Sequence, residues 1–334
     1  MVKKWKLSHP ARGGKGLAVI GSVILAFSLS GCAVIKLGQS YDSPIQEQVV
    51  DEGKTEDKVL ILSINGTLSD SPKRGLLSQA PSLLDSVMMQ LKKAEEDKKI
   101  KAVVLKINSP GGGVTVSDIL YHELLSFKER THKKLYVQMM DVAASGGVYI
   151  AMAADHIQAH ASTITGSVGV ISINADLSGT MDKIGAAVNV YKTGDNKDMG
   201  SPFRSATESD KTIFQNMVDG MAENFYDVVK IQRKLTDEQM AELKTARIFT
   251  GKDAIEAGLV DSLGYLSDAA EQACKLAEAK DCKVVSYRFK ANPNATSYSP
   301  SMSLQEGVQP VQLLDIPLLE QAKLKAGIYY LYLQ

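Results

Sequence analysis

Short, mostly apolar runs alternate with amphipathic segments of helix length in the first half of this chain. The runs at 59–64, 102–107 and 135–140 have the length and composition of strands buried on both faces. Between the first two runs, apolar residues recur at steps of three and four over 83–94, and a second amphipathic segment opens at Val116. The order strand, helix, strand, helix, strand predicts an α/β fold with a mainly parallel sheet.

The second half of the chain continues with less regular spacing. Further apolar runs lie at 168–173 and 187–191, and apolar residues that share one face over 214–228 predict a long helix. A methionine and aromatic stripe of this kind is typical of a core or a subunit interface. Thr236 and Gln239 have the spacing of a capping box, which predicts the start of one more helix.

The N-terminus has the three parts of a secretory signal: a basic stretch, an apolar stretch over 16–29, and the tetrapeptide Leu-Ser-Gly-Cys that ends at Cys32. This tetrapeptide resembles a bacterial lipobox, in which the cysteine receives a diacylglyceryl group and becomes the mature N-terminus. We therefore expect a lipoprotein-type signal peptide over 1–31 and lipidation of Cys32. The alternative is an uncleaved anchor, because apolar character continues past Cys32, although Lys36 follows soon and a span needs about 20 apolar residues. Either anchor holds the body at the cell membrane, outside the cytoplasm, in the periplasm.

Composition divides the chain after the signal into three parts. Residues 32–57 are polar and rich in turn formers, so we expect a tether between the membrane and the folded domain. The folded domain is expected over 58–289. Residues 290–334 begin polar and proline-bearing and are expected to form a C-terminal tail, whose apolar segment 328–333 is a candidate for docking on a neighbouring subunit.

The charge balance argues against one class of partner. The formal net charge is zero, but only 33 of the 38 Lys and Arg residues lie after the signal, against all 38 Asp and Glu residues. A mildly acidic body without a cluster of Lys and Arg lacks the basic surface that binds nucleic acid. We expect no nucleic-acid partner.

Cys274 and Cys282 are expected in an oxidising compartment, where cysteines can pair. Cys274 lies on an alanine-rich amphipathic segment and Cys282 begins a run at 282–287, so a disulfide between them would tie a helix to the strand after it. The alternative is two separate buried thiols. No histidine stands near them in a metal-ligand spacing, and neither a metal nor another cofactor is expected.

A serine between small residues marks a candidate nucleophile. The string Ala-Ala-Ser-Gly-Gly at 143–147 stands where the strand at 135–140 should give way to a helix. Small neighbours let the backbone bend sharply, present the Ser145 hydroxyl, and leave the Gly146 amide free to face a reacting carbonyl. The alternative interpretation is an ordinary tight turn. None of the five histidines stands in a spacing that suggests a partner base.

Lysine can replace histidine as the base if burial lowers its pKa from about 10.4 towards neutrality. The candidate is Lys197, within a polar segment at 193–203. By composition alone this segment is a turn with a solvated lysine. The neighbouring Asp195 and Asp198 oppose a lowered lysine pKa unless their carboxylates point away.

Four motifs in a fixed order carry a resemblance to a known family. They are Ser-Pro-Gly-Gly-Gly at 109–113, Ala-Ala-Ser-Gly-Gly-Val-Tyr-Ile at 143–150, Thr-Gly-Ser-Val-Gly-Val at 165–170 and Lys-Asp-Met-Gly-Ser-Pro at 197–202. Together they are similar to those of the bacterial signal peptide peptidase A family, in its short form with one catalytic unit per chain. The resemblance covers about residues 58–289 and implies that this part is the peptidase domain.

The resemblance implies a role for each matching residue. Ser145 matches the family's nucleophile and Lys197 its general base. The family's oxyanion donors are backbone amides that match Gly112 and Gly146, and such a donor typically contributes about 3 kcal/mol. Ser167 matches a serine that hydrogen-bonds and orients the lysine amine, and its alternative interpretation is a turn residue.

The same resemblance implies a fold, an assembly and a class of substrates. The family belongs with the crotonase and Clp protease folds, which are built from repeated strand-strand-helix units. Its members form homo-oligomeric rings or domes in which the lysine reaches the serine of an adjacent subunit. The implied activity is that of a serine endopeptidase with a Ser/Lys dyad, which degrades cleaved signal peptides and other unfolded, apolar peptides at the membrane.

Two other functions share some of these features. A crotonase-type enzyme that acts on acyl-CoA also holds an oxyanion with paired glycine amides, but export of the chain argues against a cytoplasmic substrate. A non-catalytic lipoprotein can use the same groove as a peptide-binding scaffold. The presence of both Ser145 and Lys197 favours the peptidase.

Overall fold

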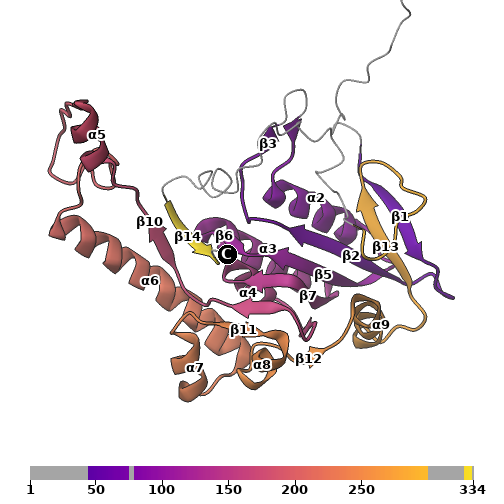
Figure 1. Ribbon diagram of the computed structural model, residues 1–334. Helices are drawn as coiled ribbons and strands as arrows, with labels where there is room; N and C mark the ends of the chain where they lie inside the picture. The colour runs from indigo at the N-terminus through magenta and orange to yellow at the C-terminus, as the bar shows by residue number, and fades with distance from the viewer. Residues whose placement is uncertain (1–43, 75–78, 300–326, 333–334) are drawn as a thin grey trace, which may run out of the picture. The chain divides into compact units, whose positions relative to one another are not determined.

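The computed structural model describes residues 44–74, 79–299 and 327–332 (Figure 1). The expected signal peptide, Cys32 and the first part of the expected tether lie outside these residues. Within the described ranges, no helix has both the length and the hydrophobicity that a bilayer crossing requires.

One sheet of nine strands organises the described residues, in the order β1-β13-β2-β5-β7-β8-β12, with β9 beside β7 and β11 beside β9. The strands are β1 (Gln46–Asp51), β2 (Lys58–Asn65), β5 (Ile100–Ser109), β7 (Lys134–Ala144), β8 (His156–Ala159), β9 (Ile164–Gly166), β11 (Ile248–Thr250), β12 (Ser262–Leu263) and β13 (Lys283–Arg288). Only β1 and β11 run antiparallel to their partners in this sheet. The predicted α/β fold with a mainly parallel sheet is confirmed.

Helices cover both faces of the sheet, which is why its central strands are apolar on both sides. The helices are α2 (Leu83–Glu96), α3 (Val114–Thr131), α4 (Gly146–Ala151), α5 (Ser178–Ile184), α6 (Glu208–Arg233), α7 (Asp237–Leu243), α8 (Gly251–Glu256) and α9 (Leu266–Leu276). On β5, Val103 and Leu105 join the core that includes α2 and α3, whereas Ala102 and Val104 join the core under α9. The capping box of Thr236 opens α7, as predicted.

Three short strands form a second sheet in the order β10-β14-β6. They are β10 (Ile171–Ile173), β14 (Gly327–Leu331) and β6 (Gly111–Gly113), while β3 (Lys73–Arg74) and β4 (Gln79–Ala80) form a separate pair. β14, the last described strand, therefore pairs antiparallel with the glycine segment of its own chain. Docking of the segment 328–333 on a neighbouring subunit stays a prediction.

Three segments differ from what the sequence suggested. The tether expected over 32–57 is wrong for β1, which is the edge strand beside β13; its residues are mostly polar and half-exposed, so they do not form an apolar run. The apolar run 187–191 forms no strand, and Tyr191 is 95% exposed. On α6, Phe225 is the one buried residue of the apolar face predicted over 214–228, and the other buried apolar residues, Ala222 and Val229, are not part of that predicted face.

A disulfide joins α9 to the start of β13. Cys274 lies in the last turns of α9 and Cys282 stands directly before the strand, eight positions later. Of the two alternatives that the sequence left open, the structure has the paired one. The bond fixes the helix against the strand that follows it.

Candidate active site

Ser145 lies at a sharp turn between the end of β7 and the start of α4. Its backbone has φ 51° and ψ −114°, a conformation that residues with a side chain rarely adopt. Both sides of the turn are held: the Ser145 amide donates to the Gly166 carbonyl at 2.8 Å, and the Ser145 carbonyl accepts from the Tyr149 amide at 3.0 Å. A serine in a strained strand-to-helix turn has the geometry of a nucleophile elbow.

The residue after Ser145 has to be glycine for α4 to begin where it does. A Cβ at Gly146 would lie 2.6 Å from the Ser117 hydroxyl and 3.2 Å from the Gly111 Cα. A Cβ at Gly111 would in turn lie 2.7 Å from the Gly146 amide nitrogen. The Gly146 amide and the glycine strand β6 therefore lie against each other beside the serine.

The glycine strand β6 has two different edges. On one edge the Leu68 amide donates to the Gly111 carbonyl at 2.8 Å, and the Gly113 amide donates to the Leu68 carbonyl at 3.1 Å. Because successive amides of a strand point to opposite sides, the Gly112 amide lies on the other edge. That edge pairs with β14, where Tyr330 stands opposite Gly112. The Gly112 amide thus lies on the edge that receives an extended strand.

Ser167 lies next to Ser145 at the same end of the sheet. β7 and β9 run parallel and pair Ala144 with Gly166, so each serine directly follows a paired residue. Ser167 is half-buried, has φ 51°, and its amide donates to the Arg247 carbonyl at 2.9 Å. The carboxyl ends of two neighbouring strands therefore place two serines at corresponding positions.

The Ser145 hydroxyl is shielded and has no histidine beside it among the described residues. Ser145 is 1% exposed, and its hydroxyl donates to the Gly169 carbonyl at 3.4 Å. His156 stacks on Tyr136 near the opposite end of β7, with its Nε2 2.8 Å from the Ser262 hydroxyl. A base for Ser145 has to come from another type of residue.

Lys197 lies in the turn-rich connection between α5 and α6, and its side chain is exposed. The amine makes no hydrogen bond or ion pair with the part of the chain that the structure describes. Figure 1 shows this connection apart from the junction of β7 and α4. Of the residues singled out by the sequence, Gly112, Gly146 and Ser167 lie around Ser145. Lys197 of the same chain does not.

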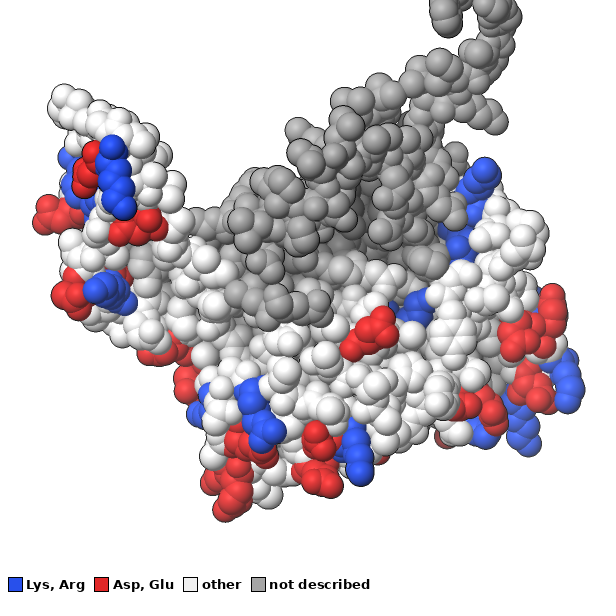
Figure 2. All heavy atoms as spheres, in the orientation of Figure 1, with Lys and Arg blue, Asp and Glu red and all other residues white. Residues whose placement is uncertain are grey.

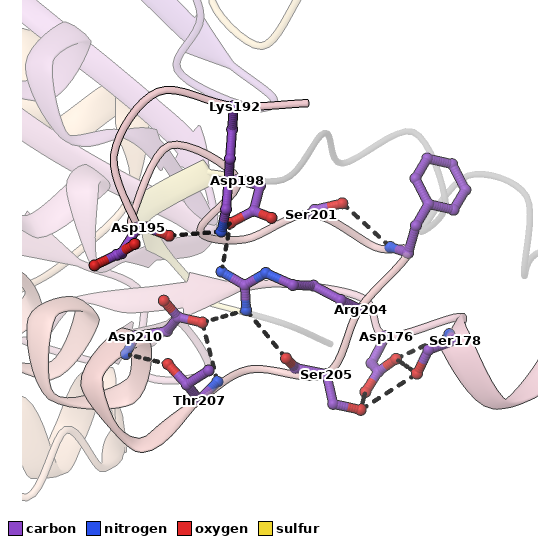
Figure 3. A network of polar contacts seen from close by, with 11 residues as sticks. Asp176, Ser178, Lys192, Asp195, Asp198, Ser201, Arg204, Ser205, Thr207 and Asp210 are labelled. Carbon is purple, nitrogen blue, oxygen red and sulfur yellow. Dashed lines mark hydrogen bonds and ion pairs between the residues drawn. The ribbon is translucent and has the colours of Figure 1, made fainter. Parts of the chain in front are cut away.

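An ion-pair network holds the connection that carries Lys197 (Figure 3). Arg204 donates to Asp198 at 2.9 Å and to Asp210 at 2.5 Å, and Lys192 donates to Asp198 at 2.7 Å. The hydrogen bonds from Arg204 and Lys192 lower the pKa of Asp198 to about 2. The sequence pointed to Asp198 but not to Arg204, whose only signal is its position two residues after the end of the fourth motif.

An aromatic cluster that the sequence did not predict borders the site. Tyr149, one helical turn after Ser145, stacks on Tyr330 of β14 and packs edge-to-face on Phe225 of α6, with ring centroids 5.2 Å and 5.0 Å away. The Tyr149 hydroxyl donates to Asp118 at 2.9 Å. Burial, followed by this carboxylate, raises the pKa of Tyr149. The tyrosine stands in the second motif, but nothing local in the sequence indicates its distant partners.

The chain matches two protein families over the residues that form this site. Residues 128–280 match Peptidase family S49, and residues 80–165 match Clp protease. The first match contains Ser145 and Lys197, and the second contains the glycine strand and Ser145. The fold is an α/β fold of the Clp protease and crotonase type, as the motifs implied.

The chain is also similar to proteins named as peptidases in several organisms. It is 35% identical over 254 residues to a protein of Enterococcus faecium named as signal peptide peptidase SppA, and the match covers 76% of this chain and 74% of that protein. A protease of Synechocystis is 34% identical over 230 residues, which cover 69% of this chain and 78% of that protease. Protease 4 of Haemophilus influenzae is 30% identical over 220 residues, which cover 66% of this chain and 35% of that protein.

Proposed function

Because this chain belongs to peptidase family S49 and is a serine peptidase, we propose that Ser145 is its nucleophile and Lys197 its general base. The proposed activity is that of an endopeptidase which degrades cleaved signal peptides and other unfolded, apolar peptides. The observation that carries the proposal is the strained turn of Ser145, packed against the glycine strand β6 and next to Ser167. The name of the Enterococcus relative supports signal peptides as substrates.

The proposed reaction has two acyl-transfer steps. The neutral Lys197 amine takes the hydroxyl proton of Ser145 as Oγ attacks the scissile carbonyl, and the oxyanion accepts hydrogen bonds from the Gly146 and Gly112 amides. Ser167 orients the amine through its hydroxyl. The lysine ammonium then gives its proton to the leaving amine, and the acyl-enzyme forms. Water, deprotonated by Lys197, attacks the ester carbonyl, and Ser145 regains its proton as the carboxylic acid leaves.

The pairing of β14 supports an extended mode of peptide binding. Tyr330 stands opposite Gly112 on the edge of β6 that carries the proposed oxyanion donor. A substrate strand that takes the place of β14 on this edge gains main-chain hydrogen bonds that do not depend on its sequence, which suits an enzyme that degrades many different peptides. Such a strand would place its scissile carbonyl close to Ser145.

The proposed dyad forms between two copies of the chain in a homo-oligomeric ring. In one chain Lys197 is exposed, and the connection that carries it lies apart from the junction of β7 and α4 (Figure 1). The residues around it expose a group of apolar side chains, Leu177, Ile184, Val188, Val190, Tyr191 and Phe203. Exposed apolar side chains that gather on one part of a surface are typical of protein interfaces. An adjacent copy seated here would cover them, remove water from Lys197 and offer its own Ser145.

The proposed location is the periplasmic side of the cell membrane. The anchor is a lipid on Cys32 or, alternatively, an uncleaved apolar segment. Cys32 and this segment both precede the described part of the chain. The disulfide between Cys274 and Cys282 supports an oxidising compartment. On the face drawn in Figure 2, basic and acidic side chains are interspersed, which supports peptides rather than nucleic acid as partners.

Two substitutions test the proposed dyad. In purified full-length protein, Ser145→Ala and Lys197→Ala should each abolish hydrolysis of an unfolded apolar peptide, with the oligomeric state unchanged in size-exclusion chromatography. Undiminished turnover in either variant would rule out the dyad. Turnover absent from the unsubstituted protein, together with tight binding of the peptide, would favour the non-catalytic scaffold.

Mixing the two inactive variants tests where the dyad forms. A copy with Ser145→Ala still offers Lys197, and a neighbour with Lys197→Ala still offers Ser145. After subunit exchange at equal amounts, about a quarter of the sites should be complete. Each complete site needs Ser145 from a Lys197→Ala copy and Lys197 from a Ser145→Ala neighbour, and each of these two positions is filled correctly about half of the time. No recovered activity after proven exchange would place both residues of the dyad in one chain.

A further inference from the structure

Two carboxylates stand close to Lys197 in the sequence, at Asp195 and Asp198. A carboxylate near a lysine favours the charged ammonium, which cannot accept a proton. A lysine that acts as a general base therefore needs the neighbouring carboxylates to be paired with other cations. In the structure, Asp198, the nearer of the two in the sequence, is paired in this way.

Asp198 is held between two cations and is 13% exposed at its side chain. Its Oδ1 accepts from Arg204 Nη2 at 2.9 Å and from Lys192 Nζ at 2.7 Å (Figure 3). Lys192 also donates to the Asp195 backbone carbonyl at 2.8 Å, which closes the turn between them. Lys197 takes no part in these contacts.

Arg204 is itself held from the other side by Asp210. This residue is 1% exposed in the first turn of α6, and it also accepts from the Thr207 amide at 3.0 Å in a capping box. The second guanidinium nitrogen of Arg204, Nη1, donates to Asp210 and to the Ser205 carbonyl at 3.1 Å. The guanidinium thus links Asp198 of the connection to the start of a long helix, in a planar geometry that only arginine provides.

We propose that Arg204 is a positioning residue for the general base: it holds the Asp198 carboxylate away from the Lys197 amine and offsets its charge, so that the lysine can lose its proton. The inference rests on the proposed role of Lys197. Other charged groups of this connection and its surroundings are Asp195, whose backbone carbonyl accepts from Lys192, Asp176, which accepts from Ser178 and Ser205, and Lys211, which pairs with Glu208. Among the described contacts, only Arg204 and Lys192 pair with the Asp198 carboxylate, so they are the cations that offset its charge.

The test is the pH profile of kcat/KM for peptide hydrolysis by the full-length protein. Arg204→Gln removes one of the two cations that pair with Asp198 and leaves Lys192 alone to offset its charge. The acid limb of the profile should therefore move to higher pH by about one unit, with about tenfold lower kcat/KM below that limb. Adding Asp198→Asn to this variant removes the less fully offset carboxylate, and the limb should return. Arg204→Lys should shift it less than Arg204→Gln.

Two further variants keep the test decisive. Asp198→Asn alone removes the Asp198 carboxylate, while Lys192 and Arg204 keep their charges and Arg204 keeps its pair with Asp210. The limb should therefore move to lower pH even if Arg204→Gln folds poorly. Arg233→Gln is the matched control, because Arg233 pairs with Asp261 at 2.6 Å, remote from this connection. It should leave the limb in place.

The outcomes separate this inference from the proposed dyad. A scaffold role alone would lower kcat/KM of Arg204→Gln by one factor at every pH, and Asp198→Asn would not restore it. That result, with Lys197→Ala inactive, overturns the role of Arg204 and leaves the dyad. An active Lys197→Ala variant overturns both.

Discussion

Ser145 and Ser167 have the same backbone φ of 51°, one residue beyond the point where two parallel strands are paired. The Ser145 amide also donates to the carbonyl of Gly166, the residue directly before Ser167. Left-handed conformations at two adjacent serines are unfavourable unless the surrounding structure holds them, and such strain gathers at functional sites. The relationship indicates that both hydroxyl groups belong to one site.

Ser167→Ala should lower kcat about 10- to 100-fold with a smaller change in KM, because the lysine amine loses the hydroxyl proposed to orient it. The measurement is steady-state hydrolysis of an unfolded apolar peptide. Ser172→Ala, which removes a half-buried serine hydroxyl from β10, is the control and should keep kcat within about twofold. Equal kcat in both variants would contradict a role for Ser167.

Gly146→Ala should abolish activity and lower the free energy of unfolding by about 1–3 kcal/mol. The added Cβ would lie 2.6 Å from the Ser117 hydroxyl and 3.1 Å from a Leu68 methyl carbon, so α4 would have to move away from β6. Gly220→Ala on α6 is the matched control, since a Cβ there has no atom within 4 Å. Urea unfolding and peptide hydrolysis measure the two effects, and an active, equally stable Gly146→Ala would show that the close approach is not required.

Strands buried on both faces are the part of the fold that the sequence predicts well. β2, β5 and β7 place alternate residues in two cores, so mostly apolar residues fit and the runs stand out. β1 does not stand out, because an edge strand with one solvated side accepts polar residues such as Gln46. β14 is equally hard to predict, since its pairing depends on contacts with Gly112, more than two hundred residues earlier.

The residues of the candidate site also differ in how well the sequence predicts them. The identities of Ser145 and Gly146 follow from local geometry: Ser145 has a positive φ, and Gly146 lies where two backbones approach closely. Both requirements select small residues, which are visible in the sequence. Arg204 has no such signature, because its contacts with Asp198 and Asp210 arise only once the connection folds onto the start of α6. The motifs therefore predict the proposed nucleophile but not the residue proposed to position its base.

Reduction of the disulfide should destabilise the chain by about 2–3 kcal/mol, the loss expected for a short closed loop. The reason is that the open loop gains conformational freedom in the unfolded state. Urea unfolding with and without a reductant measures the difference. Cys274→Ser should be destabilised to a similar extent and should no longer respond to the reductant. A reductant effect of the same size in that variant would assign the effect to something other than this bond.

The buried amine of Lys106 should give the free energy of unfolding an unusual dependence on pH. It lies on β5, is 3% exposed, and its amine donates to the carbonyls of Ser297, Tyr298 and Ser299 at 3.2, 3.0 and 3.1 Å. No carboxylate pairs with this amine in the described part of the chain, and burial, followed by the charge of Arg288, lowers its pKa to about 8.

Because the folded pKa of Lys106 lies below the ordinary value of 10.5, the unfolded chain binds more protons between these two values. The free energy of unfolding should therefore rise as the pH increases from about 8 to 10.5, by at most about 3 kcal/mol. Lys106→Met removes the titrating group and keeps an apolar stem, so urea unfolding of both proteins at several pH values isolates its contribution. The unsubstituted protein should gain stability relative to the variant across this window and show no relative change below it. A constant difference between the two proteins would mean that the buried amine titrates like an exposed lysine.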